Sequence, residues 1–180
     1  MNRIVSFIIG FALVVAVPQI GHAAPSTRLE LANGHLRTEL TQAMLEGAAR
    51  HNIQILTDGI VFASRDDGLV ANTGILGFDN LTDDDLARGT VVGLTYLSGF
   101  GLPTGFYRVF VVFPRGASTG TAQLLDEAGV AVIKAPVSLD SAKPKRGKYT
   151  TCIEAKTVSI DFHRNISIRV AFEITLDSSM

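Results

Sequence analysis

The sequence is poor in the residue types that build several common kinds of site. It has one cysteine and no tryptophan in 180 residues, and only three tyrosines. A single cysteine excludes an internal disulfide framework and any metal site that needs several thiolates. The lack of indole rings argues against a carbohydrate-binding surface built on aromatic stacking. Basic and acidic residues nearly balance, at 16 and 17, so no excess of positive charge points to nucleic acid.

A long hydrophobic run occurs only at the N-terminus. Arg3 is the only charged residue among the first 27, an apolar run over 4–17 follows it, and Gly21 and Ala23 then supply small side chains. This layout is typical of a secretory signal peptide. The run is too short for a membrane-spanning helix, which needs about 20 residues. We predict that residues 1–23 are removed and that the mature protein is secreted or periplasmic, with no membrane span.

Hydrophobic residues make up 47% of the chain, enough for a folded core. We expect a lead-in tail over 24–35 and then a single β-rich domain over 36–180 that begins with a short amphipathic helix at about 36–50. The apolar positions of that helix recur every four residues, at Leu36, Leu40, Met44 and Ala48. A helix of this length is marginal alone in water, so its apolar stripe should pack on the rest of the domain.

Strand signals dominate the second half of the chain. The segment 166–176 alternates apolar and polar residues, and so does 157–163 before it. This pattern predicts two antiparallel strands that each have one face in water. Val170 and Phe172 fall in the apolar phase, so we expect them in the core. The alternation changes phase at Lys156-Thr157, where we predict a bulge or bend.

Two further segments add strands to this prediction. Residues 106–113 are apolar on both faces apart from Arg108, as expected for a strand that is buried on both sides. Residues 121–125 and 130–133 flank Asp126-Glu127-Ala128-Gly129. Asp first and Gly last in a four-residue connection is the chemistry of a type I turn closed by a left-handed glycine, so these segments should form a hairpin.

About seven to nine short strands, with turns about every eight to twelve residues, predict an antiparallel β-sandwich, with a partly open β-barrel as the alternative. The segment Leu102–Tyr107, with the alternating strand and the hairpin that follow it, resembles immunoglobulin-like modules of secreted bacterial proteins. This resemblance rests on turn chemistry and alternation. It implies an immunoglobulin-like or similar sandwich, with the short N-terminal helix attached.

The segment Gly116-Ala117-Ser118-Thr119-Gly120 matches the Gly-x-Ser-x-Gly pattern of serine hydrolases. In those enzymes the serine stands on a sharp turn between a strand and a helix. Here the residues that follow have the pattern of a strand, so we interpret the segment as a hairpin loop and predict that the protein is not an enzyme. The alternative is a small serine hydrolase that uses Ser118 with His163 and Asp126.

The acidic segment 58–85 contains three candidate calcium ligands, Asp79, Asp83 and Asp85, because calcium prefers carboxylate oxygens. The regular acidic alternation of a calcium-binding loop is missing. Thr82 followed by three aspartates is also typical of the capped first turn of a helix. We favour the helix cap and expect no metal or other cofactor.

Positive charge is densest at Lys143, Lys145, Arg146 and Lys148. Such a cluster suits an anionic partner such as a surface polysaccharide, although a run that includes proline and glycine is more often an exposed loop. The lone cysteine, Cys152, follows in a predicted strand. We expect it to be either a buried small apolar residue or one half of an intermolecular bridge, and burial is the more common of the two.

Together these patterns predict an exported, non-enzymatic β-sandwich protein that serves as a binding, interaction or structural module in the periplasm or outside the cell. Its expected partner is a macromolecule, either a protein or a surface polysaccharide, and not nucleic acid. The alternatives are the serine hydrolase described above and a periplasmic enzyme inhibitor.

Overall fold

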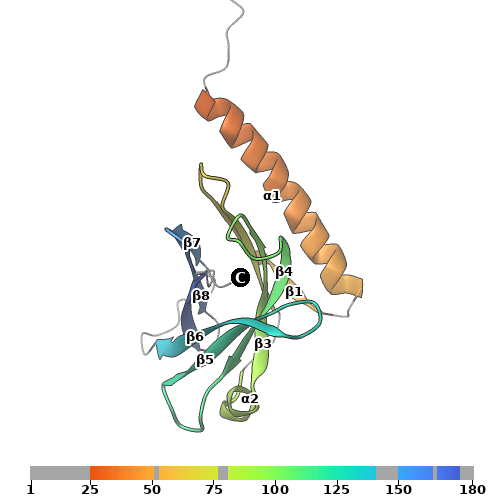
Figure 1. The fold of residues 1–180 in the computed structure, drawn as a ribbon. Helices are drawn as coiled ribbons and strands as arrows, with labels where there is room; N and C mark the ends of the chain where they lie inside the picture. Colours follow the sequence, from red (N-terminus) through yellow and green to blue (C-terminus); the bar gives the residue numbers. More distant parts are fainter. Residues whose placement is uncertain (1–24, 51–52, 77–80, 141–149, 164–165, 175–180) are drawn as a thin grey trace, which may run out of the picture.

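A single antiparallel sheet forms most of the molecule (Figure 1). The structure is a computed structural model and describes residues 25–50, 53–76, 81–140, 150–163 and 166–174. Within these residues, nine strands lie in the order β1-β2-β3-β4-β5-β6-β9-β8-β7, and all neighbours are antiparallel. The helices and strands are α1 (Pro25–Arg50), β1 (Ile55–Ser64), β2 (Val70–Leu76), α2 (Asp83–Arg88), β3 (Thr90–Ser98), β4 (Gly105–Val112), β5 (Thr119–Leu125), β6 (Ala131–Asp140), β7 (Thr150–Glu154), β8 (Thr157–His163) and β9 (Ser167–Glu173).

The sheet curls into an open half-barrel, which brings its two edge strands toward each other. Strands β1 and β7 approach closely, but they are not neighbours in the hydrogen-bonded order of the described strands. At one end, Nη1 of Arg65 donates a hydrogen bond of 2.6 Å to the carbonyl of Ala155, which links the β1–β2 turn to the β7–β8 turn. Across the interior, a Cβ added to Gly93 would lie 2.9 Å from Cε1 of Phe162, so β3 and β8 pack tightly at this point.

The mainly antiparallel β prediction is confirmed, the sandwich is not confirmed, and the alternative of a partly open barrel fits the sheet. A sandwich and a half-barrel both give strands with one buried and one wet face, so alternation does not distinguish them. The pairing of β6 with β9 does, because it joins the strands β1–β6 and the strands β7–β9 into one continuous sheet.

The hydrophobic core fills the concave side of the half-barrel. Phe100, Phe113 and Phe172 are its largest fully buried side chains. Val170 and Phe172 have no exposed surface, whereas Arg169 on the same strand is exposed. The predicted phase of β9 is therefore confirmed.

The predicted hairpin between β5 and β6 is also confirmed. The amide of Gly129 donates to the carbonyl of Asp126 at 3.0 Å, and Oδ1 of Asp126 accepts from the amide of Val130 at 2.8 Å. Gly129 has a φ of 87°, a conformation that glycine adopts without strain. The preceding strand, β4, is fully buried on one face, and its other face is only partly covered.

Two local predictions about the C-terminal strands are wrong. The change of phase near Lys156 is the turn of a hairpin between β7 and β8, not a bulge, and Ala155 in that turn has a φ of 50°. Cys152 is exposed rather than buried. The reason is the phase of β7, in which Thr151 takes the buried position and Cys152 points outward.

Helix α1 runs along the outside of the sheet (Figure 1). It begins at Pro25, so it includes residues that were expected to form a lead-in to a helix over 36–50. In its C-terminal half, Met44 and Ala48 are buried against Ile55 at the start of β1. Among the residues that the structure describes, no helix is long and apolar enough to cross a bilayer.

Candidate functional site

Helix α1 packs on the outer face of β1–β3 because that face is apolar and locally flat. Gly74 on β2 has no side chain, and a Cβ there would overlap Sδ of Met44. Partly buried side chains of Ile60, Leu76 and Leu94 surround this contact. The helix thus lies close to the sheet at β2 and leaves space beside it, over β3 and β4.

That space is a groove with a cavity volume of about 550 Å³. Its size falls within the range of about 300–1,000 Å³ that is typical of small-molecule sites. One wall comes from α1, the floor from β3 and β4, and one end from the turn between β5 and β6. The lining residues are Ala43, Met44, Gly47, Ala48, Ile53, Leu94, Gly105, Phe106, Tyr107, Arg108, Asp126 and Glu127.

The floor of the groove carries an aromatic ring that is accessible to solvent. Phe106 is 37% exposed, and it and Val130 are the two large hydrophobic residues that are exposed in the described part of the chain. The ring of Phe106 packs edge-on against Tyr96, with 5.3 Å between ring centroids and an interplanar angle of 64°. This contact, which is favourable for aromatic pairs, fixes one side of the ring and leaves the other toward the groove.

One end of the groove is polar. Arg108, next to Phe106 in the same outward phase of β4, donates through Nη2 to the carbonyl of Asp126 at 3.3 Å. Of the ion pairs between described residues, none involves Arg108. The carboxylate of Asp126 accepts from the amide of Val130 within its own turn, and Glu127 is exposed. The groove therefore has apolar walls and a half-buried guanidinium at one end.

Tyr107 contributes to the rigidity of this floor from the other face of β4. Its hydroxyl donates to the carbonyl of Pro103, which ties the start of the strand to the preceding turn. Burial raises the pKa of Tyr107, and the negative charge of Asp126 raises it further. The tyrosine is thus held in its neutral, hydrogen-bonding form.

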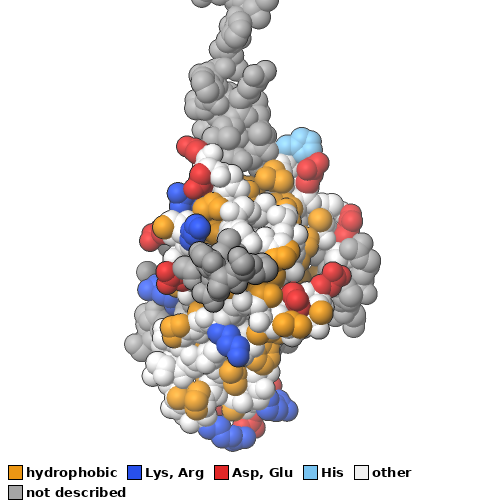
Figure 2. Space-filling model, viewed as in Figure 1, with side chains coloured by type: hydrophobic (Ala, Val, Ile, Leu, Met, Phe, Trp, Pro, Cys, Tyr) orange, Lys and Arg blue, Asp and Glu red, His pale blue; other side chains and the backbone are white. Residues whose placement is uncertain are grey.

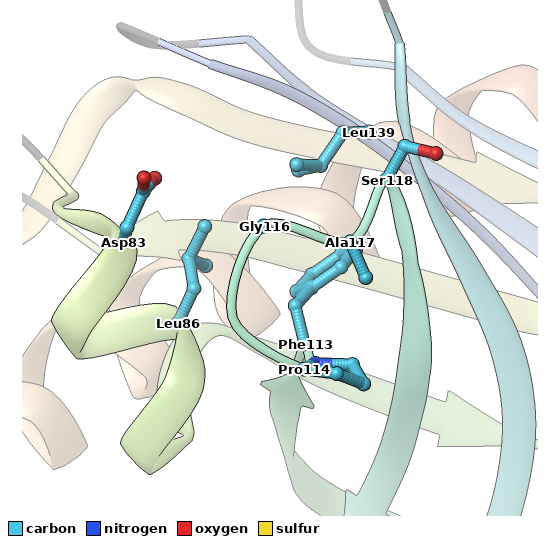
Figure 3. A pocket seen from close by; sticks show the side chains of 8 residues that line it. All are labelled: Asp83, Leu86, Phe113, Pro114, Gly116, Ala117, Ser118 and Leu139. Carbon is cyan, nitrogen blue, oxygen red and sulfur yellow. The ribbon is translucent and has the colours of Figure 1, made fainter.

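A smaller pocket lies beside α2 and contains two residues that the sequence singled out. Ser118 and Asp83 both line this pocket of about 220 Å³, together with Leu86 and Phe113 (Figure 3). In Figure 3 the hydroxyl of Ser118 points away from the other lining side chains. The loop that carries it continues into strand β5, not into a helix, as the hairpin-loop interpretation predicted.

The structure does not bring the three candidate triad residues together. Ser118 and Asp126 flank the two ends of β5, which puts their backbones about 26 Å apart at about 3.3 Å per residue. His163 lies on β8, three strands away from β5 in the sheet order, which is a path of about 14 Å along the sheet. The side chain of His163 lies outside the described part of the chain.

Asp85, one of the aspartates proposed as calcium ligands, is engaged in a helix cap. Thr82 caps α2, and the amide of Asp85 donates to its Oγ1 at 3.2 Å. The amide of Thr82 donates in turn to Oδ2 of Asp85 at 3.0 Å. These two bonds complete a capping box, so the predicted cap is confirmed.

The hydrogen bond from the side chain of Thr82 is the main cause that lowers the pKa of Asp85, with smaller contributions from the backbone of Thr82 and from Arg88. Asp84 pairs with Arg115 at 2.9 Å. Within the described ranges, no group of three or more His, Cys, Asp and Glu residues is placed to hold a metal ion. Asp79 lies outside those ranges, as do residues 1–23 and the basic cluster Lys143, Lys145, Arg146 and Lys148.

Comparisons of this chain with protein-family models, with curated proteins and with solved structures find no match. Sequence reasoning missed the groove because its two walls come from segments about sixty residues apart. One signal was present, since Arg108 is the single charged residue in an otherwise apolar strand.

Proposed function

We propose that this protein is an exported, non-enzymatic binding module that holds an apolar group of its ligand in the groove between α1 and strands β3 and β4. The observation that carries the proposal is the accessible ring of Phe106 on the floor of a groove of about 550 Å³. The export part rests on the predicted signal peptide. The groove narrows the expected partner from any protein or polysaccharide to a molecule with an apolar part.

Several features support binding rather than a purely structural role. A concave site with apolar walls and a few polar groups at one end is the usual form of a ligand pocket. On the face shown in Figure 2, acidic and basic side chains are both scattered, and neither sign forms a large patch. Recognition through the apolar groove therefore accounts better for binding than attraction by a broad charged surface.

Fluorescence of the neutral apolar dye N-phenyl-1-naphthylamine tests the proposal. We expect the dye to bind one site on the mature protein with increased emission. Ala43 lines the groove and Ala49 is exposed on α1 outside it. Ala43→Phe should fill the groove and weaken dye binding at least tenfold, whereas Ala49→Phe adds the same ring to the same helix and should not.

A second matched pair tests the floor. Phe106→Ala should weaken dye binding, and Val130→Ala, which truncates the other exposed large hydrophobic residue, should leave it unchanged. Dye binding that is absent, or that is equally strong in Ala43→Phe and in the unaltered protein, would overturn the proposed function.

A further inference from the structure

Arg108 gives the groove a chemical preference that its apolar walls do not. We infer that the ligand is an amphiphile with one apolar chain and an anionic head group, and that Arg108 binds the head. This inference rests on the proposed function, since it concerns the same groove. It goes further by naming the class of ligand and the residue that selects it.

The guanidinium of Arg108 is positioned but not neutralised. A guanidinium has five N–H donors in a fixed plane, and the structure uses one nitrogen, Nη2, in a long bond of 3.3 Å to the carbonyl of Asp126. Gly129 in the same turn leaves room for it, since a Cβ there would lie 3.1 Å from Nη2. Its remaining donors can therefore take a planar anion such as a carboxylate in two parallel hydrogen bonds.

Among the described residues, neither acidic residue at this end of the groove forms an ion pair with Arg108. The carboxylate of Asp126 is turned toward the amide of Val130, with which it forms a bond of 2.8 Å. Glu127 is exposed, so water and salt screen its charge effectively. Arg108 is half-buried beside apolar walls, where screening is weaker, so its charge is screened less than that of Glu127.

The order of residues along the groove fits an amphiphile. Arg108 lies at the end formed by the β5–β6 turn, and in Figure 1 this turn reaches toward the C-terminal part of α1. Leu94 pairs directly with Arg108 across β3 and β4, Phe106 lies two residues before Arg108 in the same phase of β4, and Met44 lines the groove from α1. A chain laid on these side chains would place its head group against Arg108.

Competition against N-phenyl-1-naphthylamine, with monomeric ligands, separates the head from the chain. Dodecanoate, dodecanol and dodecyltrimethylammonium share one chain and differ in head charge. We expect dodecanoate to bind the unaltered protein at least tenfold more tightly than dodecanol, which corresponds to about 1.4 kcal/mol, and dodecyltrimethylammonium to bind more weakly than both. Acetate, which has the head without the chain, should not compete.

The ratio of the dodecanol and dodecanoate dissociation constants is the quantity to compare between variants. Arg108→Gln should reduce this ratio to about one, and Arg115→Gln, which removes an arginine outside the groove, should leave it as it was. Glu127→Gln should raise the ratio only slightly, because water and salt screen this exposed carboxylate, and it tests the same electrostatics without altering Arg108. A ratio near one in the unaltered protein, with dodecanol still bound, overturns this inference alone. Failure of the dye and of dodecanol to bind overturns the proposed function as well.

Discussion

The outer faces of strands β2 and β9 belong to the same sheet but have opposite environments. On β9 the outward residues Arg169, Ala171 and Glu173 are exposed, and the strand alternates between buried and exposed positions. On β2 nearly every residue is buried, because α1 covers the outward positions around Gly74. A strand that is covered on both faces has no alternation to reveal it, so the covered part of a sheet is harder to recognise from sequence than the uncovered part.

The face of β2 that α1 covers also contains a buried polar side chain without hydrogen-bond partners among the described residues. Asn72 lies on the outward side of β2, between Phe62 and Tyr96 on the neighbouring strands. It is completely buried, and among the described residues neither Nδ2 nor Oδ1 has a hydrogen-bond partner. A buried unsatisfied polar group costs about 1–3 kcal/mol. The contact between α1 and the sheet can therefore be improved at this position.

The largest expected effect on the unfolding free energy comes from the core on the concave side of the sheet, to which both β2 and β9 contribute. Phe172 on β9 is fully buried, and truncating a buried phenylalanine typically costs about 3–5 kcal/mol. Phe172→Ala should therefore unfold the domain or nearly do so in a urea titration. Arg169→Ala on the uncovered face should change the unfolding free energy by only a small fraction of the effect of Phe172→Ala. Equal and small effects would show that the phase of β9 is misassigned.

The next largest expected effect on stability concerns α1, the helix that covers the outer face of β2 and leaves that of β9 exposed. Met44 is 1% exposed and contacts Gly74, and Met44→Ala should reduce the unfolding free energy by about 2–5 kcal/mol. Gln42→Ala, on the exposed side of α1, removes only a side-chain bond to Glu46, worth about 0.2–0.5 kcal/mol. If Met44→Ala were as mild as Gln42→Ala, α1 would not be a stable cover of β2.

Asn72→Val should raise stability, in contrast to the other substitutions. It replaces an unsatisfied amide by a β-branched apolar group that favours strands, and we expect a gain of about 1 kcal/mol. Ser159→Val on β8, an outward position opposite the exposed Cys152, is the control and should give little. A loss of stability in Asn72→Val would mean that the amide has a role in the region under α1.

The smallest expected effect on stability concerns the cap of α2, which belongs to neither the β2 nor the β9 face. The lowered pKa of Asp85 means that its ionised form stabilises the fold. That stabilisation is present above the pKa of the unfolded chain, near 3.9, and is lost as pH falls through the lower folded value. Asp85→Asn should therefore flatten the fall in stability below about pH 4. An unchanged acid limb would show that the capping box is not formed in solution.

The features that the sequence predicted correctly are those set by neighbouring residues. The hairpin at Asp126–Gly129, the cap at Thr82 and the phase of Val170 and Phe172 each follow from a few consecutive side chains. The half-barrel could not be distinguished from a sandwich because both satisfy the same alternation. The environment of Arg108 depends on where α1 lies, and nothing local to β4 indicates that.

The hydrogen bond between Arg65 and Ala155 spans 90 positions in the sequence, while most strand pairs join consecutive segments. Contacts of long sequence separation have the largest loop-closure entropy to overcome, so they tend to form late. The nearby edges of β1 and β7 share no ladder hydrogen bonds in the described strands. Amide exchange at β7 should then report a local opening that leaves β3–β6 protected. The molecule would begin to unfold where the edge strands β1 and β7 meet, before its central strands open.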